Sequence, residues 1–203
     1  MEVRGVALKA YFVQYKFIIP EGIKHSSYTY QKLFRAIYGY FQQVTKSNGK
    51  TYTYHRPGVL SDTPFIRHGK NCVVIHPTSF QPLLNFFKTG KNPGHIWEVK
   101  GDWKAVYYLN EKSLELDTAV PALEGLVDRT YISTPTKEQS LLIKEMEAIR
   151  QAASQNRKMD EFHKKIVFDS AHKIASHDWF KECYNKSPKL KNFYSLYSFL
   201  KQG

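Results

Sequence analysis

The sequence predicts an α+β fold with a mixed N-terminal domain over residues 1–110, an acidic connector over 111–132 and a helical C-terminal region over 133–203. Two patterns favour this division. Apolar and polar residues alternate early in the chain, as in a half-buried strand, and later apolar residues recur three and four positions apart, as on one helix face. With 42% apolar residues in a chain of 203, there is enough apolar side chain for a core.

The first expected elements are a strand and a helix. The alternating strand over residues 7–19 has one apolar face, made of Tyr11, Val13, Tyr15, Phe17 and Ile19. Pro20 and Gly22 end this strand. Ser26 or Ser27 is the expected N-cap of the helix that follows. The apolar stripe of that helix consists of Leu33, Phe34, Ile37, Tyr38 and Phe41.

Further strands and a second helix complete the N-terminal domain. The expected strands cover residues 51–55, 71–76, 96–100 and 103–109, and the last two form a hairpin. Between the second and third of these, Thr78 or Ser79 begins a helix whose apolar residues are spaced at i, i+3, i+4 and i+7. Gly90 ends that helix.

In chain order these elements read β-α-β-β-α-β with one extra strand. This is the ferredoxin-like arrangement, in which two helices cover one face of an antiparallel sheet. The opposite face is then open to a ligand. The C-terminal region is expected to be helical in two or three pieces, beginning at Thr134 with Pro135 in the first turn.

Basic and aromatic residues are concentrated in the first 110 residues. This part holds 15 of the 30 Lys and Arg but only 5 of the 18 Asp and Glu, so that it carries +10 of the net charge of +12; it also holds 20 of the 30 aromatic residues. Cations neutralise phosphates, and aromatic rings stack on unpaired bases. We therefore expect a nucleic-acid-binding protein that prefers RNA or single strands, on its own or as a subunit of a ribonucleoprotein complex. A protein-interaction subunit with an acidic partner is another interpretation of the charge.

The expected contacts with nucleic acid lie in three segments: around the first helix, in the strand over 51–55, and around the loop after the second helix. Gly90 and Gly94 bracket that loop, and glycines let the backbone approach a phosphate. The residues expected to bind are Lys24, Tyr28, Tyr30, Lys32, Arg35, Tyr52, Tyr54, Lys88 and Lys91.

A nuclease is the alternative function, and one candidate catalytic residue is His25, just before the first helix. Histidine can take the proton from an RNA 2′-hydroxyl near neutral pH, and a neighbouring lysine such as Lys24 can stabilise the charge on the phosphorane. In its order of elements this region resembles the ferredoxin-like endoribonucleases that process CRISPR repeats, which place a histidine in this neighbourhood. The resemblance is architectural and implies RNA cleavage without a metal.

A second candidate centre consists of Glu98 and Lys100, separated by one residue at the end of an apolar strand. With Asp62 upstream, this pair resembles the PD-(D/E)xK nucleases, which hold Mg²⁺ with an aspartate and a glutamate while the lysine supports the attacking water. The resemblance implies Mg²⁺ as a cofactor in this alternative alone. The 36 positions between Asp62 and Glu98 depart from the compact hairpin of those nucleases. A charge pair between Glu98 and Lys100 is the competing interpretation.

The remaining sequence features indicate no further chemistry. The eight histidines have no zinc-binding spacing and no phosphate-loop motif occurs, so we expect no bound metal or cofactor outside the Mg²⁺ alternative. Cys72 and Cys183 fit no C-x-x-C pattern, which indicates a reducing compartment and a cytoplasmic protein. No window approaches the roughly 18 apolar residues of a membrane span, so we expect no membrane.

Overall fold

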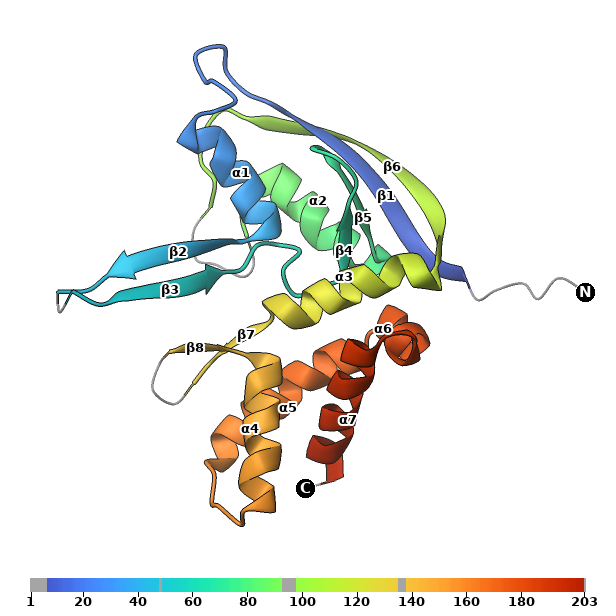
Figure 1. Ribbon diagram of the computed structural model, residues 1–203. Coiled ribbons are helices and arrows are strands. Elements are labelled where there is room, and N and C mark those ends of the chain that lie inside the picture. The colour runs from blue at the N-terminus through green and yellow to red at the C-terminus, as the bar shows by residue number, and fades with distance from the viewer. Residues whose placement is uncertain (1–6, 48, 93–97, 135–137, 203) are drawn as a thin grey trace, which may run out of the picture. The chain divides into compact units, whose positions relative to one another are not determined.

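The computed structural model describes residues 7–47, 49–92, 98–134 and 138–202 and has a mixed α+β architecture (Figure 1). The chain divides into two compact units. We call residues 9–113 the basic unit, and residues 1–8 together with 114–203 the helical unit.

The described part of the basic unit contains a four-stranded antiparallel sheet, two α-helices and a separate β-hairpin. Its elements are β1 (Ala7–Ile18), α1 (Tyr28–Tyr38), β2 (Tyr40–Thr45), β3 (Thr51–Arg56), β4 (Phe65–Arg67), β5 (Cys72–Ile75), a 3-10 turn (Pro77–Ser79), α2 (Phe80–Thr89) and β6 (Lys104–Glu115). The strands of the sheet are adjacent in the order β4-β5-β1-β6, and β5 is antiparallel to both of its neighbours. Strands β2 and β3 pair only with each other among the described residues.

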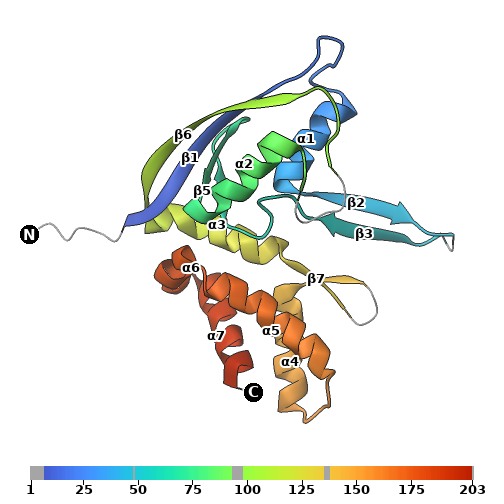
Figure 2. The same ribbon diagram turned by 180° about the vertical axis from the view of Figure 1, so that it is seen from behind.

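One face of β1 packs against both helices of the basic unit. The ring centroid of Tyr15 lies 6.3 Å from that of Phe34 on α1 and 5.4 Å from that of Phe87 on α2. The Phe17 ring contacts the same two rings at 5.5 and 6.0 Å. Both helices therefore cover the same face of the sheet (Figure 2). The core between them includes Val13, Leu33, Ile37, Val73, Ile75, Leu83 and Phe86.

Local interactions determine where the two helices begin and end. The Ser27 Oγ accepts a hydrogen bond from the Tyr30 amide at 3.2 Å, so Ser27 is the N-cap of α1 and decides between the two expected residues, Ser26 and Ser27. Gly39 follows α1 with a φ of 77°, and a Cβ at this position would lie 2.8 Å from the Arg56 carbonyl oxygen. Gly90 ends α2 in the left-handed conformation, which confirms the expected C-terminus.

The structure differs from the expected elements at the end of α1. The helix stops at Tyr38, and residues 40–45 form β2, because Gly39 turns the backbone and the following residues pair with β3. Phe41, assigned to the apolar stripe of the helix, therefore lies in a strand and is 56% exposed.

The expected hairpin over 96–100 and 103–109 is also different. Residues 96 and 97 lie outside the described part of the chain, and Glu98 forms a single antiparallel bridge with Lys91. Strand β6 instead lies beside β1 in the main sheet. Strand β4 was not expected, because three residues are too few to show a period.

The helical unit begins with α3, where the sequence suggested an irregular connector. Its elements are α3 (Leu116–Arg129), β7 (Tyr131–Ser133), β8 (Gln139–Leu141), α4 (Leu142–Ser154), α5 (Glu161–Ala175), α6 (Asp178–Cys183), a 3-10 turn (Tyr184–Lys186) and α7 (Pro188–Gln202). Helix α3 forms because apolar residues at helical spacing are buried while Asp117 and Asp128 are exposed. These buried residues are Ala119, Ala122, Leu123, Leu126 and Val127.

The expected helix start at Thr134 and Pro135 falls partly outside the described residues, and α4 begins at Leu142. Within the described ranges, no helix combines the length and apolar content that a membrane crossing requires.

Candidate nucleic-acid interface

The exposed face of α1 presents one aromatic ring with two cations close to it. Tyr28, Lys32 and Arg35 are spaced at i, i+4 and i+7, which places them on one helix face. The Lys32 Nζ lies 4.8 Å from the Tyr28 ring centroid, and the Arg35 guanidinium carbon lies 5.5 Å from it. Tyr28 is 61% exposed, so its ring remains open to a ligand beside these cations.

The β2–β3 hairpin continues this arrangement. In its register, Tyr40 lies opposite Arg56, and the residues that follow on the same face include Tyr54 and Tyr52. The rings of Tyr52 and Tyr54 are stacked with centroids 6.5 Å apart. Lys46 Nζ lies 4.3 Å from the Tyr52 ring centroid, and the Arg56 guanidinium carbon lies 5.5 Å from that of Tyr54. The hairpin thus repeats the pairing of cation and ring.

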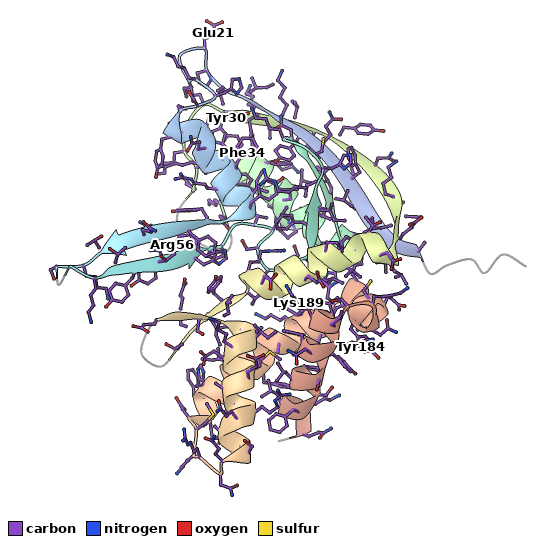
Figure 3. All side chains as sticks on the ribbon, in the orientation of Figure 1. Glu21, Tyr30, Phe34, Arg56, Tyr184 and Lys189 are labelled. Atoms are coloured by element: carbon purple, nitrogen blue, oxygen red, sulfur yellow. The ribbon has the colours of Figure 1, made fainter. Side chains whose placement is uncertain are left out.

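Tyr40 joins the helix face to the hairpin face, because the Arg35 guanidinium carbon lies 5.1 Å from its ring centroid. A hydrogen bond that the Arg56 Nε donates to Gln42 Oε1 at 2.9 Å fixes the position of Arg56 on the hairpin. Figure 3 shows Arg56 on the hairpin and Tyr30 on α1. We call this set the cation–aromatic surface; it consists of Tyr28, Lys32, Arg35, Tyr40, Lys46, Tyr52, Tyr54 and Arg56.

A cleft of about 370 Å³ adjoins the cation–aromatic surface at Arg35. Its lining combines residues from the loop before α1, from α1 itself, from β4 and from the turn after β4: His25, Tyr30, Gln31, Phe34, Arg35, Arg67 and Lys70. The His25 ring packs edge-on against the Tyr30 ring, with centroids 4.5 Å apart. We call this the His25 cleft. Three of its seven lining residues are permanent cations and none is a carboxylate.

A second, smaller cleft of about 210 Å³ lies within the cation–aromatic surface: Tyr28, Lys32, Arg35 and Tyr40 line it together with Glu98. The Glu98 carboxylate is 3.7 Å from the Lys100 Nζ, which is the charge pair anticipated as the competing interpretation. No group of three or more His, Cys, Asp and Glu side chains in the described ranges is arranged to hold a metal ion.

The structure brings together most of the residues expected to bind nucleic acid. Tyr28, Lys32, Arg35, Tyr52 and Tyr54 all belong to the cation–aromatic surface. The others lie elsewhere: Tyr30 is 4% exposed and packs in the core, Lys24 is exposed in the loop before α1, and Lys88 and Lys91 are exposed at the end of α2.

Sequence reasoning missed five cations and rings of these sites: Tyr40, Lys46, Arg56, Arg67 and Lys70. Residues 40–45 show no apolar–polar alternation in sequence, so no local signal marked Tyr40 as part of a strand. No local signal marks Arg67 and Lys70, because the cleft forms only when β4 and the turn after it pack beside α1.

No protein-family model matches the chain, and neither curated proteins nor solved structures give a significant match. The geometry of the two sites is therefore the ground for a functional proposal.

Proposed function

We propose that the protein binds nucleic acid with little sequence preference, RNA or single strands before duplex DNA, through the cation–aromatic surface. The observation that supports this is the pairing of each of four cations with an aromatic ring on one surface from α1 to the hairpin. Such pairs offer a phosphate a charge and offer a base a flat apolar face at the same place.

The aromatic rings of the hairpin favour single strands. The rings of Tyr52 and Tyr54 are stacked with centroids 6.5 Å apart and lie beside Lys46 and Arg56. An unpaired base can stack on such a platform while its phosphate meets a cation. A base that is already paired and stacked in a duplex cannot reach the platform without leaving its neighbours.

We also propose that the basic unit has the ferredoxin-like arrangement with an inserted hairpin. Without β2 and β3, the chain order is β-α-β-β-α-β, and both helices lie on one face of the sheet. The hairpin is then an insertion between α1 and β4 that extends the basic surface. A place as one subunit of a ribonucleoprotein complex in the cytoplasm belongs to the same proposal.

The binding proposal is tested by filter-binding titrations with single-stranded RNA, single-stranded DNA and duplex of one sequence. If the four cations each neutralise one phosphate, log K plotted against log[salt] has a slope of about −3 for single strands. A flat salt response contradicts the proposal and favours a protein partner instead.

Cleavage of RNA is a second candidate function, and the His25 cleft is the observation in its favour, because it places an imidazole among three cations. In this case cleavage persists in EDTA, stops with His25→Ala, and fails on a substrate with a 2′-deoxy at the cut site. For the Mg²⁺ alternative, EDTA and Glu98→Ala each stop cleavage and His25→Ala does not.

A further inference from the structure

The His25 cleft has the charge expected of an anion-binding site, but among the described residues its histidine lacks the hydrogen-bonded partner that orients a catalytic imidazole. A histidine acting as a general base is normally held by a third group that fixes which ring nitrogen carries the proton. Within the described ranges, the His25 ring has its edge-on contact with Tyr30 and no hydrogen bond. The cations, in contrast, come from three separate elements and converge on one recess.

These cations are not neutralised by neighbouring acids. Among the described residues, no carboxylate lies within ion-pair distance of Arg35, Arg67 or Lys70. Glu98 lines the smaller cleft together with Arg35, and its ion pair is with Lys100. Three uncompensated cations in one recess favour a ligand with more than one negative charge.

Aromatic rings lie beside two of these cations. The Arg67 guanidinium carbon lies 4.4 Å from the Tyr38 ring centroid, and the Lys70 Nζ lies 5.9 Å from that of Tyr30. The Tyr30 phenol is in the core and burial raises its pKa, so this residue adds no negative charge to the site. The recess therefore combines a neutral aromatic floor with a cationic rim.

We infer that the His25 cleft binds a phosphate monoester at the end of a nucleic-acid strand whose body lies on the cation–aromatic surface. A phosphate monoester carries about −1.5 to −2 at neutral pH, whereas each internal phosphodiester carries a single negative charge, so three cations match the monoester better. Arg35 lines both the cleft and the cation–aromatic surface, which makes the two sites continuous. The inference rests on the proposed function, since it names the end group of the same ligand.

The volume agrees with this ligand. The cleft measures about 370 Å³, at the lower end of the roughly 300–1,000 Å³ of small-molecule sites. It has room for a terminal phosphate together with part of its nucleotide. Phe34 and Tyr30 offer that nucleotide an apolar wall.

The test compares three single-stranded RNAs of about 12 nucleotides, within the site sizes of such surfaces, labelled internally and ending in a 5′-phosphate, a 3′-phosphate or hydroxyls only. Fluorescence anisotropy measures their affinities at one ionic strength. We expect one of the two phosphorylated strands to bind about five- to ten-fold more tightly than the hydroxyl-ended strand, as one charge-assisted contact would give. The two phosphorylated arms distinguish which end of the strand enters the cleft.

Lys70→Gln and Arg67→Gln should each reduce this preference to less than about two-fold, while the affinity for the hydroxyl-ended strand changes little. Lys112→Gln, which removes an exposed lysine of β6, is the matched control and should preserve the preference. Because Arg67 also packs on Tyr38, the exposed Lys70 gives the cleaner result if Arg67→Gln destabilises the fold.

Equal affinities for all three strands would overturn the inference and leave the proposed function intact. Cleavage of the hydroxyl-ended strand in EDTA that stops with His25→Ala would also overturn it, because the cleft would then act on an internal phosphodiester. If no strand binds at all, the proposed function fails. In that event, the melting temperature measured in inorganic phosphate and in chloride tests the cleft alone. A stabilisation by phosphate that is lost in Lys70→Gln supports the anion site. No stabilisation of the unsubstituted protein by phosphate overturns it.

Discussion

The basic unit and the helical unit contain the same number of basic residues in opposite environments. Each has 15 Lys and Arg, but the basic unit has 5 Asp and Glu against 13 in the helical unit, so the net charges are +10 and +2. In the helical unit, cations pair with carboxylates, as Lys189 does with Asp128 at 2.7 Å and Lys186 with Asp117 at 3.6 Å. In the basic unit, Lys46 and Arg56 lie over aromatic rings instead.

This difference matters because a ring does not neutralise the cation beside it. A carboxylate partner has to be displaced before a phosphate can take its place, whereas a cation over a tyrosine keeps its full charge. The number of lysines and arginines is therefore a poor guide to binding. Their immediate neighbours distinguish a surface prepared for a polyanion from one that is internally balanced.

The largest expected effect comes from removing four charges from the cation–aromatic surface. Changing Lys32, Arg35, Lys46 and Arg56 to Gln should weaken single-strand binding by about 30- to 1,000-fold at low salt and reduce the salt slope by about 3. Lys164, Lys181, Lys186 and Lys189 changed to Gln remove the same charge from the helical unit. This control should cost less than about three-fold. Equal losses in the two variants would show that net charge alone accounts for binding.

The next effect concerns the rings. Tyr52→Ala or Tyr54→Ala should weaken binding of single strands by about 1–3 kcal/mol, because a base loses its stacking partner, and should leave the salt slope unchanged. Tyr194→Ala in α7 removes an exposed ring from the helical unit and serves as the control. Anisotropy titrations at several salt concentrations measure both quantities. A changed slope with Tyr52→Ala would contradict a stacking role.

The two units should also differ in their response to alkali. Burial raises the pKa of the Cys183 thiol in the helical unit from 9.0 to about 11. Because the unfolded state then loses its proton first, stability falls as the pH rises above 9, by about 1 kcal/mol at pH 10. In the basic unit, burial likewise raises the pKa values of Tyr15 and Tyr38, whose hydroxyls are 2.9 Å apart, so the corresponding loss begins above pH 10.

Hydrogen exchange followed separately in the two units measures these onsets. The helical unit should lose protection at lower pH than the basic unit, and Cys183→Ala should remove that early onset although it lowers stability at neutral pH. A common onset in both units, or an early onset that persists in Cys183→Ala, would contradict this assignment.

The smallest effect is expected for an exposed ion pair. Lys189→Gln removes the contact with Asp128, whose hydrogen bond raises the pKa of Lys189. Since both side chains are largely solvated, the free energy of unfolding should fall by no more than about 0.2–1 kcal/mol, and high salt should abolish the difference. Thermal melts with and without salt measure this. A larger loss would mean that the ion pairs of the helical unit are structural.

The sequence predicted those elements of the basic unit that show a clear period. Alternation identified β1, and helical spacing identified α1 and α2. The N-cap of α1, Ser27, is one of the two residues expected, and α2 ends at Gly90 as expected. It did not identify β2, because Phe41 also fits the continuing helical stripe and only the pairing with β3 decides between the two periods. Helix α3 was missed because Pro121 lies inside it among acidic residues.

For the candidate sites too, local sequence patterns predicted the residues that share one element, but not the residues that only the tertiary fold brings together. Tyr28, Lys32 and Arg35 share a helix face that spacing alone defines, and alternation alone places Tyr52 with Tyr54. The cleft depends on contacts across the fold, which no local pattern reports. His25 was singled out for its neighbours in sequence, yet its partners in the cleft, Arg67 and Lys70, follow it by 42 and 45 positions.

The antiparallel pairing of β2 with β3 allows the hairpin to be lengthened at its tip without changing its base. At the base of the hairpin, the backbones of Gly39 and Gly58 approach each other closely. A larger residue at either position would push the two backbone segments apart, so both positions require glycine. Beyond the pair of Thr45 and Thr51, however, two residues added to each strand would lengthen the ladder and keep every existing ring on its face. Each added repeat would supply one more ring at the same interval. Evolution or design could thus change the length of strand that is covered, one nucleotide at a time, without altering the body of the unit.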